Sequence, residues 1–218
     1  MDIFDKNLAS TRFLDWDREP VLSRVRDITA GIDGAPEKAA ALFLFVRDAI
    51  RYNPYVNFLD PRVYVSSTVI GTPSTFCVPK AVLLASMARA AGIPSRIRFA
   101  DIRNRLMPDK MKDLLKSDII YGHGFAELNI AGRWIKATPA YDRALCETHG
   151  FRLTGFNGRE DAIFPESDLA GRPHIEYLAY SEPFDDFPYE WMTAYYLEKY
   201  EMFRKVEPLL RKEIEQKA

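Results

Sequence analysis

Apolar positions at helical spacing dominate the first quarter of the chain. They predict a helix over residues 21–30 and a stronger one over residues 36–52, where Pro36 suits the first helical position. The apolar stripe of the second helix consists of Ala40, Leu42, Phe43, Val46, Ala49 and Ile50. Helices of this kind usually cover a core, so we expect both to be structural.

The helical periodicity stops after residue 52. Pro, Gly, Ser, Thr and Asn become frequent over residues 53–75, which predicts an irregular segment. A third helix follows, with Pro79 at its first position, Gly92 at its end and Pro94 beyond. Its stripe of mostly small side chains favours close packing. Cys77 is therefore expected just before this helix or in its N-cap region.

Strand-like patterns mark the middle of the chain, where residues 121–130 alternate between two faces. Residues 96–102 and 121–130 are predicted strands, and the pair Ala131-Gly132 predicts a two-residue turn into a further strand over residues 133–138. The turn predicts four pairs: Ile130 with Arg133, Glu127 with Lys136, Phe125 with Thr138, and His123 with Ala140. Thr138 and Asp142 then become the diagonal neighbours of His123, unless Pro139 ends the pairing earlier.

The remaining segments show weaker patterns. Residues 103–118 form a charged insert with one apolar helical face, which we interpret as a surface flap, and residues 150–173 are rich in turn formers. Residues 190–218 predict one long charged helix packed on the domain. The aromatic stretch over residues 177–196 can line a substrate groove, although such stretches more often belong to the core.

Composition sets the class of protein. The chain has 218 residues, of which 47% are hydrophobic and 28% charged, so we expect one well-packed domain over residues 1–218. Its net charge is -1 and its basic residues are dispersed, which argues against nucleic acid and a membrane surface as partners. The N-terminus lacks a signal pattern and no apolar run approaches the roughly 20 residues that span a bilayer. We therefore expect a cytoplasmic protein.

Metal and disulfide chemistry find no support in the sequence. The two cysteines, at positions 77 and 146, are too few for a disulfide scaffold. Histidines at positions 123, 149 and 174 are too scattered for a zinc site, and no calcium-loop signature is present. We expect two free thiols and no cofactor or metal.

Cys77 and His123 are the candidates for chemistry. A thiol at a helix start meets unpaired N–H groups and the positive end of the helix dipole, which favour thiolate and can also bind an oxyanion. His123, on a strand, is the natural base for such a nucleophile. The structural alternative for Cys77 is a small buried hydrophobe, and His149 and His174 are interpreted as structural.

The motifs around these two residues resemble the transglutaminase-like superfamily. The resemblance rests on residues 77–81 (CVPKA), 89–96 (RAAGIPSR), 123–128 (HGFAEL) and 132–136 (GRWIK), and covers roughly residues 43–142. It implies a papain-like α+β fold, with a central helix packed on an antiparallel sheet and helices flanking this core at both ends. It also implies that Cys77 is the nucleophile and His123 the base.

The sequence departs from the family pattern at the third catalytic position. That position is usually Asp before a Pro, four residues after the Trp; here it holds Thr138. Thr can orient an imidazole but supplies no negative charge. Asp142 is the closest carboxylate and either replaces the missing Asp or caps residues 143–149. The family also tends to have Gly two residues before the Cys, where this chain has Thr75.

The resemblance implies acyl transfer from an amide through a thioester on Cys77. Hydrolysis of a protein or peptide substrate is favoured, as by a cysteine protease or amidase, because bacterial and archaeal superfamily members are often protease-like. Two alternatives stay open: amine transfer to protein glutamine, and a non-catalytic peptide-binding module that retains an incomplete triad. The sequence does not predict an oligomeric state.

Overall fold

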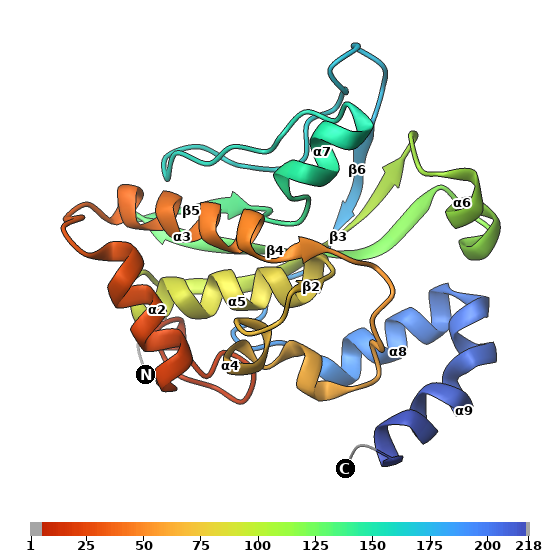
Figure 1. Ribbon diagram of the computed structural model, residues 1–218, viewed down its shortest axis with the longest axis horizontal. Coiled ribbons are helices and arrows are strands. Elements are labelled where there is room, and N and C mark those ends of the chain that lie inside the picture. Colours follow the sequence, from red (N-terminus) through yellow and green to blue (C-terminus); the bar gives the residue numbers. More distant parts are fainter. Residues whose placement is uncertain (1–5, 217–218) are drawn as a thin grey trace.

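A four-stranded antiparallel sheet and one buried helix form the centre of the molecule. The structure is a computed structural model and describes residues 6–216. The sheet has the order β5-β4-β3-β6, and α5 lies along one of its faces (Figure 1). The strands are β3 (Ser95–Asn104), β4 (Ile119–Ile130), β5 (Arg133–Ala137) and β6 (Ile175–Tyr180). This arrangement confirms the α+β class and the central helix on an antiparallel sheet.

Helix α5 (Cys77–Ala90) begins two residues before the start that Pro79 predicts. Phe76 is its N-cap and Cys77 its first residue, so Pro79 occupies the third position of the first turn. Every residue of the helix except Ala90 is buried. Its close contact with the sheet depends on Gly124 of β4, where a Cβ would lie 2.8 Å from Val78 Cγ2. The contact holds the start of α5 against the middle of β4.

The N-terminal helices pack beside α5 and are shorter than predicted at one end. They are α2 (Glu19–Thr29) and α3 (Ala35–Ala49), and both contact α5 (Figure 1). The predicted extension of α3 to residue 52 is wrong, because the chain turns extended at Ile50 and forms β1 (Arg51–Tyr52). β1 pairs in parallel with β2 (Ser74–Thr75), which leads into α5. Between them lie η1 (Pro61–Tyr64) and α4 (Ser66–Val69).

The β4–β5 hairpin has the predicted two-residue turn. Ala131 and Gly132 both have positive φ, 52° and 78°, as a type I′ turn requires. The pairs Ile130–Arg133 and Glu127–Lys136 form as expected, but pairing ends at Ala126–Ala137. Past that point the N–H of Thr138 donates to Ala162 O at 2.8 Å. The expected pairs of Phe125 with Thr138 and of His123 with Ala140 are therefore wrong.

The remaining helices follow β3, β5 and β6 along the chain. The charged insert contains α6 (Asp109–Leu115), and α7 (Arg143–His149) follows β5. The long helix predicted over residues 190–218 is two helices, α8 (Tyr189–Lys199) and α9 (Glu201–Gln216), separated by extended and buried Tyr200. The sequence does not predict β6, which overlaps the start of the aromatic stretch, as a strand. No helix within residues 6–216 is long and apolar enough to span a bilayer.

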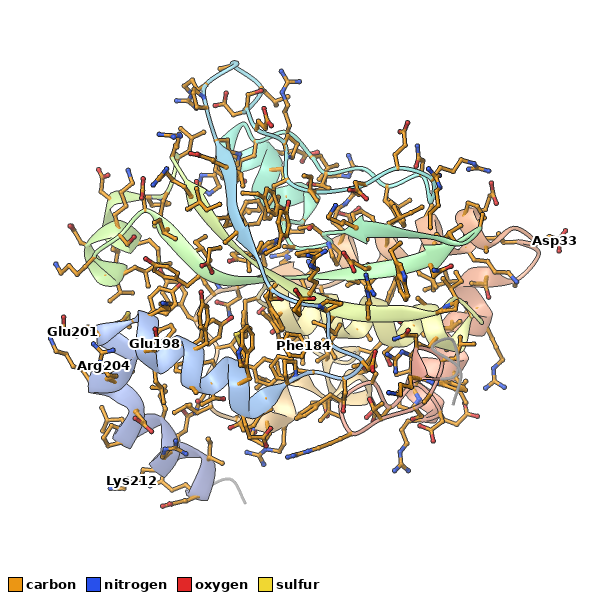
Figure 2. All side chains as sticks on the ribbon, turned by 180° about the vertical axis from the view of Figure 1, so that it is seen from behind. Asp33, Phe184, Glu198, Glu201, Arg204 and Lys212 are labelled. Carbon is orange, nitrogen blue, oxygen red and sulfur yellow. The ribbon has the colours of Figure 1, made fainter. Side chains whose placement is uncertain are left out.

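Helix α8 packs on the sheet, whereas α9 extends from it. Phe184, labelled in Figure 2, packs against both Phe99 of β3 and Trp191 of α8, with ring centroids 5.8 and 5.1 Å away. Glu198, Glu201 and Lys212 lie at the outer edge of this helix pair (Figure 2). The opposite side of α9 faces a cavity described below.

Candidate active site

Cys77 lies where α5, β4 and a large cavity meet. It is 5% exposed and belongs to the lining of a cavity of about 650 Å³. The backbone N–H groups of Gly124, Val78 and Cys77 itself interact with its sulfur. Backbone N–H groups that surround a sulfur in this way also lie close to the carbonyl oxygen of any group that the sulfur attacks.

Burial overrides the helix start in setting the protonation of this thiol. Desolvation raises the pKa of Cys77 to about 11, although the three N–H groups and the charge of Lys80 lower it. The helix start favours thiolate as expected, but burial outweighs this effect, and the thiol form predominates in the unliganded protein. Burial, followed by the charge of Asp142, raises the pKa of Cys146 to about 11 as well. Acidity does not distinguish the two thiols.

Access does distinguish them, because Cys77 lines the cavity and Cys146 does not. We expect small neutral iodoacetamide to modify Cys77 faster than Cys146 in the folded protein. Peptide mapping by mass spectrometry gives the two rates. Equal rates, or faster labelling of Cys146, would remove the argument that Cys77 is the accessible nucleophile.

His123 lies on β4, next to the glycine whose N–H reaches the Cys77 sulfur. Its ring packs against Phe164 and Tyr177, with centroids 4.9 and 6.2 Å away. Burial lowers the pKa of His123 to about 3, and its Nε2 is buried without a hydrogen-bond partner. The imidazole is therefore neutral at pH 7, the form that accepts a proton, but it is a weak base.

Thr138 and His123 share a neighbour, Tyr177. It is fully buried at the end of β5, beside the hydroxyl of Tyr177, but its own hydroxyl lacks a partner at normal hydrogen-bond geometry. Tyr177 contacts the His123 ring and accepts a hydrogen bond from the N–H of Phe164 at 3.2 Å. Thr138 and His123 thus both lie beside the Tyr177 side chain. Within residues 6–216, no hydrogen bond joins the two.

Asp142 is the N-cap of α7, which confirms the capping interpretation. Its Oδ1 accepts from the N–H of Leu145 at 3.0 Å and its Oδ2 from the N–H of Tyr52 at 2.7 Å. Among the described residues no hydrogen bond connects this carboxylate to His123. The structure therefore brings Cys77, His123 and Thr138 to one region and uses both oxygens of Asp142 to hold backbone. An orienting role for Asp142 remains a sequence-based hypothesis.

Comparison with known proteins identifies the family. The family model for the transglutaminase-like superfamily matches residues 23–139, more than half of the chain. The chain belongs to the transglutaminase-like superfamily. The match extends further toward the N-terminus than the motifs of residues 43–142, because it includes most of α2 and all of α3.

Two solved structures are distantly similar to this transglutaminase-like chain. One is a candidate cysteine protease from Cytophaga hutchinsonii, with 16% identity and a TM-score of 0.49 over 84% of this chain and 55% of its own. The other is a candidate protease from Parabacteroides distasonis, with 16% identity and a TM-score of 0.40 over 62% of this chain and 25% of its own. The chain thus spans about half the length of the first and a quarter of the second. No curated protein matches it.

Lys80 is a residue of this site that the sequence motifs contain but do not explain. It is fully buried, and its Nζ donates to the carbonyls of Arg47, Ile50 and Ala140 at 2.9, 2.6 and 2.9 Å. Burial lowers the pKa of Lys80 to about 7, against the opposing charge of Asp142. The side chain ties the end of α3 and the segment after β5 to the first turn of α5. The available signal was a lysine in the first turn of a mostly apolar helix.

No metal site emerges from the transglutaminase-like core. Across residues 6–216 no three His, Cys, Asp or Glu side chains are grouped so that they could hold a metal ion. His174 is buried with its Nε2 unpaired, and burial lowers its pKa. His149 is exposed and lines the cavity.

His123 is buried in its neutral form, which predicts that the free energy of unfolding decreases in acid. Its pKa falls from 6.5 to about 3 on folding, so between these values the unfolded chain binds more protons and stability decreases as pH falls. We expect the unfolding free energy of the wild type to drop by about 2 kcal/mol more than that of His123→Leu between pH 7 and pH 5. Urea denaturation at both pH values measures this. Equal drops would contradict the buried neutral imidazole.

Proposed function

We propose that this transglutaminase-like protein is a thiol-dependent hydrolase that cleaves amide bonds, with Cys77 as nucleophile and His123 as base. The proposal rests on one observation above all: Cys77 is the first residue of the central helix, borders a cavity, and has its sulfur beside the N–H of Gly124, the residue after His123. A thiol nucleophile, a histidine on the strand that contacts it and N–H donors are parts that acyl transfer uses.

The reaction proceeds in two steps, acylation of Cys77 and hydrolysis of the thioester. His123 accepts the thiol proton while the sulfur attacks the amide carbon, and the N–H groups around the sulfur stabilise the oxyanion. The C–N bond then breaks, the amine leaves with the proton from His123, and the acyl group remains on Cys77 as a thioester. Water, deprotonated by His123, attacks the thioester carbon and releases the acid and the thiol.

The pKa values constrain how the first step occurs. A thiol with a pKa of about 11 and an imidazole with a pKa of about 3 form an ion pair at a cost on the order of 10 kcal/mol before their mutual attraction is counted. A standing thiolate–imidazolium pair is therefore not expected in the unliganded protein. Proton transfer is expected to accompany attack on the bound carbonyl.

The test is cleavage of acyl p-nitroanilides of short and long acyl chain, followed by p-nitroaniline absorbance. We expect release that depends on Cys77, with the free acid as product. Added glycine methyl ester distinguishes amine transfer, because an N-acyl-glycine methyl ester would then form in place of the acid.

A non-catalytic peptide-binding module is the second candidate. Thr138 in the acidic position, the neutral thiol and the unpaired imidazole favour it. It predicts no p-nitroaniline release above the level of Cys77→Ala for any acyl chain, and that result would replace the hydrolase proposal.

A further inference from the structure

Two peripheral helices turn their apolar sides toward the cavity beside Cys77. Met111, Leu114 and Leu115 of α6, with Val206 and Leu210 of α9, belong to the lining of this cavity of about 650 Å³. Neither helix contains a buried residue. Their apolar side chains are therefore at most partly buried against the core, and a ligand would complete their burial.

The cavity has the size and composition of a ligand site. Its volume falls within the roughly 300–1,000 Å³ of small-molecule pockets. Methionines at 107, 111 and 202 line it, and such side chains adapt to flexible apolar ligands. Cys77 supplies a nucleophile in the same wall.

Hydrogen bonding within the lining disfavours a peptide as the occupant. The side chain of Asn57 donates to Leu210 O at 3.0 Å, and that of Asn104 accepts from the N–H of Leu106 at 3.1 Å. The hydroxyls of Tyr196 and Tyr200 are bonded to β4 backbone. A peptide backbone brings a donor and an acceptor with every residue, and these four lining side chains are already engaged.

Charge disfavours a free fatty acid. Among residues 6–216, the cavity lining contains no Lys or Arg side chain and one carboxylate, Glu213, which lies 3.2 Å from the amide of Asn57. A carboxylate head group would therefore enter without a cation and beside a like charge. A neutral carbonyl next to Cys77 meets neither penalty.

We propose that the cavity between α6 and α9 binds a long aliphatic acyl chain whose neutral carbonyl, in an amide, lies at Cys77. This inference rests on the proposed function for the fate of the amide and specifies the acyl half of its substrate. The two helices act as a lid that orders when the chain enters, while the amine half of the substrate stays outside this cavity.

Calorimetric titration of the full chain tests the occupant directly. The ligands are decanamide, decanoate, acetamide and N-acetyl-dileucinamide, added to the wild type and to Cys77→Ala. We expect decanamide to bind both proteins at least about 100-fold more tightly than acetamide and about tenfold more tightly than decanoate or the peptide. Tighter binding of decanoate or of the peptide would overturn the proposal, as would failure of decanamide to bind.

Adjacent leucines of α9 provide a matched pair of variants. Leu210 lines the cavity and Leu209 is 70% exposed outside it. Leu210→Glu should weaken decanamide binding by at least about tenfold, while Leu209→Glu should stay within about twofold of the wild type. Equal effects would overturn the location. Hydrogen exchange should also show decanamide protecting residues 109–115 and 201–216, and unchanged exchange there would contradict the lid.

Binding and cleavage separate the two proposals. Decanamide binding without p-nitroanilide cleavage refutes the hydrolase and leaves the acyl-chain site standing. Cleavage that does not depend on acyl length, together with absent decanamide binding, refutes the acyl-chain site and leaves the hydrolase.

Discussion

Cys77→Ala is expected to lower the rate of p-nitroanilide cleavage by at least about 10⁴-fold, because removal of a covalent nucleophile leaves only binding and oxyanion stabilisation. His123→Ala should cause a comparable loss, and the double variant should lose little more, since the two side chains act in one step. The measurement is kcat/KM from p-nitroaniline absorbance.

The second thiol provides the control. Cys146 lies in α7, is buried, and does not line the cavity. Cys146→Ala should keep the wild-type rate. A loss with Cys146→Ala equal to that with Cys77→Ala would show that the assay responds to folding and not to the nucleophile, and the assignment would fall.

Lys80→Met is expected to lower the free energy of unfolding by about 3 kcal/mol, because it leaves three buried carbonyl oxygens without their donor, at about 1 kcal/mol each. Methionine keeps a similar length and an apolar chain, so lost packing contributes little. Chemical denaturation followed by tryptophan fluorescence gives the value.

Lys212→Met is the matched control, since Lys212 is exposed at the outer edge of α9 (Figure 2). It should change the unfolding free energy by less than about 0.5 kcal/mol. If Lys80→Met is as mild as Lys212→Met, the three hydrogen bonds do not hold α3 and the segment after β5 to α5.

Local sequence signals predicted the elements where side-chain period and turn chemistry agree. The β4–β5 hairpin follows from alternation and from an Ala-Gly turn, and its first pairs form as expected. The pairs expected at the far end of the hairpin do not form, because the N–H of Thr138 donates to Ala162 O instead. No local pattern in the sequence predicts that the segment around Ala162 approaches β5. The end of α3 and the break at Tyr200 depend likewise on tertiary contacts.

The sequence indicated which residues are candidates for the site but not their electrostatics. The motifs indicated Cys77 and His123, and the helix start suggested a thiolate. Burial reverses that suggestion, and burial is a property of the assembled fold. The apolar face of α6 was visible in the sequence, but the cavity requires α6 and α9 together. Both interpretations of Asp142 fit the sequence, and only the structure shows its two oxygens on backbone N–H groups.

The most direct test of the account is the covalent intermediate itself. Acid-quenched reactions of the wild type with decanoyl p-nitroanilide are digested and analysed by mass spectrometry. The account predicts a decanoyl group on the peptide that contains Cys77, released by hydroxylamine as a thioester and absent from Cys77→Ala. Release of p-nitroaniline with no acyl group on Cys77, or with the acyl group on another residue, would contradict it.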